Sequence, residues 1–178
     1  MKPKSIKTSG LEKKVALFAV MVIAVISSAS TFKADFSGQW TFDPIKSNLN
    51  ESGMMAPIKM IISQEKNNIV IQRISRNQQS ETITLTDNIS FDGKETDGTG
   101  FLNSTRRSSM TWESNDMFKI RIAIHGNVEG NAFAVAITET WTISPDRNAL
   151  TIDRESNGTR GLMLTKHVYN REMTMSKR

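Results

Sequence analysis

Apolar and polar side chains alternate along most of the chain beyond residue 35, with a repeat of two residues. The pattern opens at residues 36–42, where Phe36, Trp40 and Phe42 share one phase with Gly38. A repeat of two is typical of a β-strand with one buried face. We therefore predict a first strand at 36–42 and expect the rest of the folded chain to be organised around it.

The same repeat predicts a series of further strands, separated by turns rich in Gly, Pro, Asn and Asp. After a polar loop at 43–57, the predicted strands are 58–63, 69–73, 82–86, 89–96, 101–112, 118–124, 132–144, 150–154 and 161–169. The strand at 89–96 competes with a hairpin turn at Asp92-Gly93.

No window beyond the N-terminal segment shows helical spacing of apolar residues. Short strands at hairpin spacing predict an all-β domain, either a barrel or a sandwich. We favour an antiparallel up-and-down β-barrel of about 8–10 strands, because a closed meander leaves no unpaired edge strands. The predicted domain covers residues 35–170, and we expect residues 171–178 to form a frayed tail.

The N-terminal segment has a different pattern and predicts a secretory signal peptide at residues 1–30. Five lysines precede an uncharged apolar run at 15–26, and small residues follow at 27–30. As a helix, that run would span about 18 Å, which is short of the ~30 Å hydrocarbon core of a bilayer. We therefore expect cleavage near Ser30, no stable membrane span afterwards, and a periplasmic or extracellular location in a bacterium.

Removal of this segment changes the charge balance. The whole chain has 23 basic and 18 acidic residues, whereas the part after residue 30 has 18 and 17. A nearly neutral domain lacks the basic surface expected of a nucleic-acid-binding protein. The chain contains no cysteine, so no disulfide framework is expected.

Several stretches resemble lipocalin-like (calycin) barrels. The Gly38-Gln39-Trp40 stretch resembles the Gly-X-Trp opening of those proteins. Residues 139–146 followed by 150–152, together with the turn at 92–95, resemble secreted bacterial lipocalin-like domains with no assigned activity. The resemblance implies an up-and-down barrel that is closed at one end by the tryptophan of the first strand.

The resemblance also implies a cation–π contact on Trp40 from a late basic residue, for which Lys166 and Arg171 are the candidates. As large aromatic residues, Trp40 and Trp141 are expected to lie in the core. Gly38 is expected to be structural as well, because it lets the backbone turn into the first strand.

The sequence shows no constellation that points to catalysis or to a metal. His125 and His167 lie far apart, with no cysteine or carboxylate at metal-ligand spacing. Ser108 and Ser109 lack a nucleophile motif. We therefore predict no catalytic residue, no metal and no cofactor.

Three arginines fall on the apolar face of their predicted strands. Arg73, Arg106 and Arg154 share the phase of apolar neighbours, and a meander brings their strand ends to one end of the barrel. Guanidinium groups gathered there could hold a carboxylate. Alternatively, each could extend past the rim into water. We take these arginines, with Trp112 on the same face as Arg106, as candidate ligand contacts.

Two functions of different classes are open. One is binding of a small hydrophobic or amphipathic molecule, anionic ones included, in the barrel interior. The other is a structural or protein-interaction module whose barrel is filled. The predicted strand at 132–144 is compatible with either function. One of its faces has only alanine and threonine at positions 132–142. Its other face has large or charged residues: Phe133, Val135, Ile137, Glu139, Trp141 and Ile143. An inward Ala/Thr face favours a cavity, and an inward large face favours a filled barrel.

Overall fold

The computed structural model describes residues 32–50, 56–77, 79–100, 103–159 and 161–172. The chain divides into an N-terminal unit, Met1–Phe32, and a second unit, Lys33–Arg178. All the described strands belong to the second unit. The predicted signal peptide lies outside the described residues, as do residues 173–178. Within the described part we find no helix with the length and hydropathy that a membrane crossing requires.

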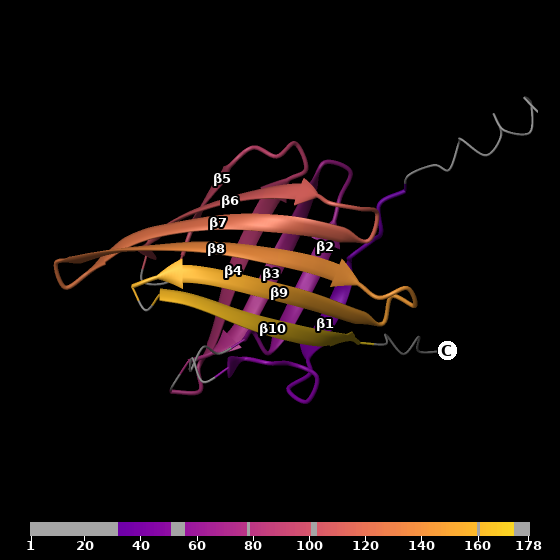
Figure 1. The fold of residues 1–178 in the computed structure, drawn as a ribbon, viewed down its shortest axis with the longest axis horizontal. Helices are drawn as coiled ribbons and strands as arrows, with labels where there is room; N and C mark the ends of the chain where they lie inside the picture. The colour runs from indigo at the N-terminus through magenta and orange to yellow at the C-terminus, as the bar shows by residue number, and fades with distance from the viewer. Residues whose placement is uncertain (1–31, 51–55, 78, 101–102, 160, 173–178) are drawn as a thin grey trace, which may run out of the picture. The chain divides into compact units, whose positions relative to one another are not determined.

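Ten antiparallel strands form one sheet in the second unit (Figure 1). They are β1 (Gly38–Phe42), β2 (Lys59–Gln64), β3 (Asn68–Arg76), β4 (Thr82–Ser90), β5 (Thr96–Thr99), β6 (Thr105–Trp112), β7 (Met117–Val128), β8 (Asn131–Ile143), β9 (Ala149–Gly158) and β10 (Gly161–Arg171). The predicted all-β, antiparallel fold class is confirmed.

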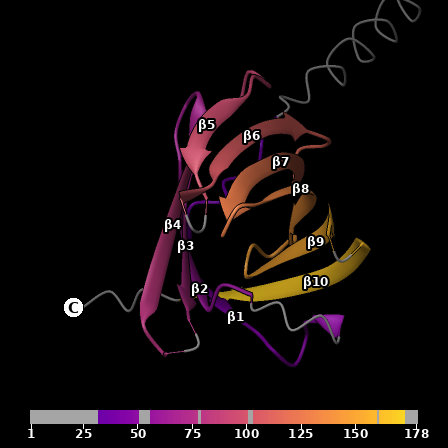
Figure 2. The same ribbon diagram turned by 90° about the vertical axis from the view of Figure 1, so that its left-hand side faces the viewer.

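The sheet curls into a nearly closed barrel, because the first strand pairs with the last. Trp40 of β1 lies opposite Arg171 of β10, and Phe42 lies opposite Tyr169. Strands β4 and β5 are the two ends of the hydrogen-bonded order. Figure 2 shows the strands arranged around an interior, with β3 and β4 facing β8 and β9. Among the described strands, the ring therefore has one seam, where β4 lies beside β5 and β6 without a backbone ladder.

The inner face of β8 is the one with large side chains. Ile137, Trp141 and Ile143 are buried, whereas Ala132 and Ala134 on the opposite face are exposed. The Ala/Thr face therefore points outward and contributes no space to the interior. This is the orientation that the filled-barrel alternative requires.

Aromatic side chains fill one end of the barrel interior. The ring of Phe36 lies 4.6 Å from that of Phe118, and Phe118 stacks on Trp141 at 5.3 Å between centroids. Trp40 and Trp141 are both fully buried. Trp40 also donates a hydrogen bond from Nε1 to the carbonyl oxygen of Phe36 at 3.0 Å, so its polar group is satisfied.

Arg171 clamps the first strand to the last. Its Cζ lies 4.2 Å from the centroid of the Trp40 ring, so of the two basic candidates it is Arg171 that makes the cation–π contact. Its guanidinium also donates to the carbonyl oxygens of Ser37 at 2.6 Å and Arg147 at 2.7 Å. Lys166 instead forms a backbone bridge with Asn48.

The clamp requires a glycine at position 38. Gly38 has a φ of 141°, and a Cβ at this position would lie 2.6 Å from Nη1 of Arg171. The guanidinium cannot move aside without losing its two carbonyl acceptors and the Trp40 ring. Gly38 is thus required both by its backbone conformation and by the space that Arg171 occupies.

The barrel extends slightly beyond the predicted boundary at residue 170. Arg171 is the last residue of β10. Glu172 accepts hydrogen bonds from the hydroxyl of Thr41 at 2.6 Å and from Nζ of Lys59 at 2.9 Å. The first residues of the expected frayed tail are therefore held by β1 and β2.

The predicted strand at 89–96 is wrong. Ile89 belongs to β4, where it lies opposite Ile69 and is buried. A turn follows, in which the backbone N–H of Lys94 donates to Asp92 at 3.0 Å and Gly93 has a positive φ of 77°. The hairpin turn at Asp92-Gly93 thus separates β4 from β5, because the β3–β4 ladder ends at Ser90, opposite Asn68, and the left-handed Gly93 follows it.

Truncation of Trp40 is expected to destabilise the domain. Trp40→Ala removes a fully buried side chain and the surface on which Arg171 stacks, and such core truncations cost about 3–5 kcal/mol. Urea unfolding followed by circular dichroism measures the loss. A midpoint unchanged from wild type would contradict the role assigned to this residue.

Gly38→Val tests whether the contact between Arg171 and the first strand needs a glycine at position 38, and Gly161→Val is the matched control. Gly161 also has a positive φ, of 82°, but a Cβ there would meet nothing within 4 Å. Both substitutions strain the backbone, and only Gly38→Val displaces Arg171. We expect Gly38→Val to lower the free energy of unfolding by at least about 2 kcal/mol more than Gly161→Val. Equal losses would show that Arg171 adjusts freely.

Candidate functional site

A cavity of about 450 Å³ occupies the other end of the barrel. Apolar side chains form much of its wall: Pro57, Ile83, Leu85, Ile124, Val135, Ile137 and Met163. They lie near the turns that join β3 to β4, β7 to β8 and β9 to β10. The interior is therefore filled at one end and hollow at the other.

The size of the inward residues along single strands explains this division. On β9 the inward positions pass from Leu150 and Ile152 through Arg154 to Ser156 and Gly158. Large side chains therefore fill one end of the strand, a charged one follows, and small ones leave space. On β3 the same order recurs as two isoleucines, an arginine and a serine: Ile69, Ile71, Arg73 and Ser75.

A layer of five charged side chains separates the filled end from the cavity. It comprises Arg73 of β3, Asp87 of β4, Arg106 of β6, Glu139 of β8 and Arg154 of β9, and we call it the charged floor. Four of its side chains are at most 9% exposed, and that of Arg154 is 16% exposed. The charges are thus held away from bulk water. They interact more strongly in this buried layer than they would in water.

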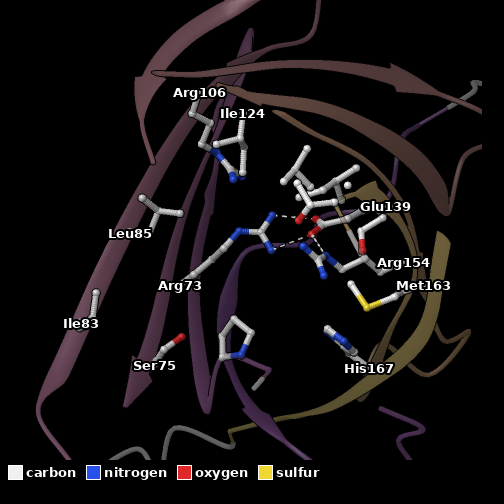
Figure 3. Close-up of a pocket in the computed structure, with 16 residues that line it drawn as sticks. Arg73, Ser75, Ile83, Leu85, Arg106, Ile124, Glu139, Arg154, Met163 and His167 are labelled. Atoms are coloured by element: carbon white, nitrogen blue, oxygen red, sulfur yellow. Dashed lines mark hydrogen bonds and ion pairs between the residues drawn. The ribbon is translucent and has the colours of Figure 1, made fainter. Parts of the chain in front are cut away.

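Arg73 crosses the interior to a carboxylate on the opposite wall (Figure 3). Its Nη2 donates to Oε2 of Glu139 at 2.8 Å and its Nη1 to Oε1 at 3.3 Å, which is a bidentate pair. Its Nε donates to Oδ2 of Asp87 at 3.2 Å. The guanidinium also lies 5.2 Å from the centroid of the Trp141 ring.

Arg106 and Asp87 form a second bidentate pair, and this pair crosses the seam of the barrel. Nε of Arg106 donates to Oδ1 at 2.7 Å and Nη2 to Oδ2 at 2.9 Å. Asp87 lies on β4 and Arg106 on β6, which share no backbone ladder. A side-chain ion pair therefore joins the two strands at this point.

Glu139 is the centre of the floor. Besides Arg73, it is paired with Arg154, whose Nε lies 3.5 Å from Oε1. It also accepts a hydrogen bond at 3.0 Å from Nε1 of Trp141, at the next inward position of β8. One carboxylate thus joins strands β3, β8 and β9.

The charged floor shifts the pKa values of its members. Burial alone would raise the pKa of Glu139, but Arg73, Arg154 and Arg106 outweigh burial and lower that pKa to about 2. Burial lowers the pKa of Arg154, and Glu139 opposes that shift. Glu139 is therefore ionised near neutral pH.

His167 lines the cavity beside the floor and is neutral near pH 7. Burial is the main cause that lowers its pKa, to about 4; Glu139 opposes this shift, and Arg154 and Arg73 add to it. Its Nε2 lies 3.0 Å from the hydroxyl of Thr165. The histidine thus adds a polar surface to the cavity wall without adding a charge.

Three hydroxyl groups in the described part of the chain are buried with no hydrogen-bond partner there: those of Ser104, Ser156 and Tyr169. Ser156 lines the cavity and is 1% exposed. It follows Arg154 at the next inward position of β9. An unsatisfied buried hydroxyl costs about 1–3 kcal/mol, so this cavity presents an unused donor beside a guanidinium.

The structure brings together the three arginines predicted from the sequence and separates them from Trp112. Arg73, Arg106 and Arg154 all line the cavity; Arg73 and Arg106 are buried and Arg154 is partly buried, so none of them extends past the rim into water. Trp112 packs instead against Phe36 and Phe118 at the filled end. It does not line the cavity.

Two carboxylates of the floor were missed by the sequence analysis. Glu139 and Asp87 neutralise guanidinium groups that had been expected to be available to a ligand. A signal was present, because Asp87 shares the phase of Leu85 and Ile89, and Glu139 shares that of Trp141. An acidic residue on an apolar face is a reason to look for a buried partner.

A second, more open hollow of about 560 Å³ lies outside the barrel wall. It is formed by Asn48, Asn50 and residues of β7 to β10, among them Thr138, Asp153, Arg154 and Glu155. We find no buried polar group without a partner along it in the described residues. The cavity with the charged floor is therefore the candidate site.

Comparisons with known proteins identify no family. No family model and no curated protein match the chain. Among solved structures, the zebrafish ileal bile acid-binding protein complexed with cholic acid is 13% identical, with a TM-score of 0.48 over 77% of this chain and 98% of that one. A Schistosoma mansoni fatty acid binding protein in complex with arachidonic acid is 12% identical, with a TM-score of 0.49 over 82% of this chain and 99% of that one. The lipocalin-like resemblance stays a prediction.

The neutral His167 makes stability depend on pH. A histidine in the unfolded chain takes up a proton near pH 6.5, whereas His167 in the barrel does so only near pH 4. The unfolded state therefore binds more protons between these values, and the free energy of unfolding falls as the pH falls from about 6.5 to about 4. We expect a loss of roughly 2–3 kcal/mol over this range.

The measurement is urea unfolding at a series of pH values with two histidine variants. His167→Gln should remove most of the loss between pH 6.5 and 5, because glutamine does not titrate, whereas carboxylates such as Glu139 contribute to the loss at lower pH. His125→Gln is the matched control, since His125 is exposed on β7. An identical pH profile for His167→Gln and wild type would contradict the assignment.

Proposed function

We propose that this chain is an exported protein that binds a small amphipathic molecule in the barrel cavity. The anionic end of the ligand would lie at the charged floor and its apolar part along the wall. The observation that carries this proposal is a cavity of about 450 Å³ with apolar walls and a buried floor of three guanidinium groups and two carboxylates.

The wall of the cavity suits an apolar group. Its volume falls in the range of about 300–1,000 Å³ that is typical of small-molecule sites. Leu85, Ile124 and Val135 line it from three different strands. Burial of an alkyl chain there stabilises a complex by about 25 cal/mol per Å² of apolar surface removed from water.

The floor of the cavity suits an anion. Arg73, Arg106 and Arg154 carry three positive charges, and Asp87 and Glu139 carry two negative ones. The floor therefore has a formal charge of +1. Guanidinium groups bind a carboxylate by charge-assisted hydrogen bonds.

The geometry favours Arg154 as the residue that meets the ligand. It is the most exposed of the three arginines, and its contact with Glu139, at 3.5 Å, is the longest ion pair of the floor. The hydroxyl of Ser156, one inward step further along β9, is available to donate to the same anionic group. Together they would bind a carboxylate by charge-assisted hydrogen bonds.

A second candidate is a structural or protein-interaction module without a small-molecule ligand. The aromatic end of the barrel and the inward large face of β8 favour it, because they fill one end of the interior with side chains. Titration with an alkyl ligand separates the two, since a filled module would bind none.

Arg154→Met is expected to weaken binding of decanoate about ten- to a hundredfold. The change keeps an apolar stem and removes a charge-assisted hydrogen bond of about 1.5–3 kcal/mol. Affinity for decanol should hardly change. Titrations by isothermal calorimetry measure both constants, and native mass spectrometry of protein from its own cells would detect a co-purified ligand.

Arg107→Met is the matched control for this titration. Arg107 lies on the outer face of β6, and its side chain is 56% exposed. The Arg107→Met protein should bind both ligands as wild type does. Arg73→Met and Arg106→Met are poorer tests, because each leaves a buried carboxylate unpaired and is expected to cost about 3–5 kcal/mol of stability. No binding of decanoate to wild type would favour the filled module.

Export is supported by the N-terminal sequence pattern. Expression in a Gram-negative bacterium should yield a periplasmic protein whose N-terminus begins near Thr31, after removal of residues 1–30. N-terminal sequencing of the periplasmic fraction measures this. A protein that retains Met1 in a membrane fraction would contradict the proposal.

A further inference from the structure

We propose that His167 recognises a hydroxyl group near the anionic end of the ligand. The cavity then prefers a hydroxy acid, with its hydroxyl on carbon 2 or carbon 3, over the unsubstituted acid of the same length. This inference rests on the proposed function, because it concerns the ligand of the same cavity. The observation that carries it is a buried imidazole in the cavity wall with one ring nitrogen engaged and the other unused.

The two ring nitrogens of His167 differ in their partners. His167 lines the cavity and is 7% exposed. Its Nε2 lies 3.0 Å from the hydroxyl of Thr165, whereas its Nδ1 makes no hydrogen bond within the part of the chain that the structure describes. A polar atom of a buried side chain costs stability when it lacks a partner. Nδ1 is therefore an open position for a hydrogen bond with a ligand.

Two contacts hold the imidazole ring in place. Thr165 lies two residues before His167 on the same buried face of β10 and holds Nε2. The ring of Phe42 on β1 packs against the imidazole edge to face, with centroids 6.4 Å apart and an interplanar angle of 87°. The orientation of the ring is thus set before a ligand arrives, which lowers the cost of ordering the site on binding.

The chemistry of a neutral imidazole favours a hydroxyl as its partner. His167 is neutral at pH 7.5, because burial lowers its pKa to about 4, so one ring nitrogen donates and the other accepts. The hydroxyl of Thr165 can donate to Nε2 or accept from it, which makes Nδ1 a donor in one case and an acceptor in the other. A ligand hydroxyl satisfies Nδ1 in both cases, since it donates and accepts. An alkyl chain satisfies it in neither.

The position of His167 beside the charged floor determines where that hydroxyl lies on the ligand. The charges of Glu139, Arg154 and Arg73 all act on the pKa of His167, so the ring lies close to the floor. Figure 3 shows His167 on the same wall of the cavity as Arg154 and Met163. A ligand carboxylate at the floor would therefore bring carbon 2 or carbon 3, rather than the far end of the chain, next to the ring.

Four acids with the same chain length test this preference at pH 7.5. They are decanoate and its 2-hydroxy, 3-hydroxy and 10-hydroxy derivatives, which all carry one negative charge. Wild type should bind the better of the 2-hydroxy and 3-hydroxy acids at least about fivefold more tightly than decanoate, because the hydroxyl satisfies a buried polar atom. The 10-hydroxy acid should gain nothing, since its hydroxyl lies at the far end of the chain. Isothermal titration calorimetry gives the four constants.

Three variants assign the preference to one ring nitrogen. His167→Phe keeps a ring and removes both nitrogens, so the ratio of the two affinities, hydroxy acid over decanoate, should fall to about one. His167→Asn places an amide atom where Nδ1 lies and should restore part of that ratio. His125→Phe is the matched control, because His125 is exposed on β7, and it should keep the wild-type ratio. Circular dichroism establishes that each variant is folded.

Nitrogen NMR of wild type tests the same contact without a change at position 167. The Nδ1 resonance of His167, distinguished from that of His125 with His125→Phe, should shift when the preferred hydroxy acid replaces decanoate. If decanoate binds as tightly as every hydroxy acid, if the 10-hydroxy acid gains equally, or if the preference persists in His167→Phe, this inference is overturned and the proposed function stands. If wild type binds none of the four acids, both are overturned.

Discussion

The buried pairing of guanidinium and carboxylate groups is the interaction on which the rest of this barrel depends. Arg73 joins β3 to β8 through Glu139, and Arg106 joins β6 to β4 through Asp87. Removal of one partner would leave a buried charge uncompensated, which typically costs about 3–5 kcal/mol. The same layer closes the seam that the backbone leaves open and forms the bottom of the cavity, so structure and binding share one set of residues.

The position of this layer along the strands sets the proportion of core to cavity. On one side, isoleucines and aromatic residues such as Trp40 and Phe118 pack to full burial and supply the hydrophobic stabilisation. On the other side, Ser75, Ser156 and Gly158 replace them, and space remains. A domain with a cavity at one end of its interior needs the other end to be densely filled, and the aromatic cluster fills it.

The sequence predicted most of the fold because the two-residue repeat is strong. It put Arg73, Arg106 and Arg154 on the apolar faces of their strands, since each shares a phase with apolar neighbours, but it left open whether they meet inside the barrel or extend past the rim into water. It did not predict their pairing, because Arg73 and Glu139 meet across the barrel from positions 66 residues apart. Nor could it choose between Lys166 and Arg171, since that choice depends on the register of β1 against β10.

The clamp between Arg171 and the first strand has a consequence for the order in which the ring forms. Ser37 and Arg171 are separated by 134 residues, so nearly the whole barrel must emerge from the ribosome before its two end strands can meet. Until then β1 has an open edge and Trp40 lacks its cation. The closing step joins segments that are distant in sequence, which is typical of slowly folding β proteins. The nascent chain therefore stays unclosed throughout almost all of its synthesis.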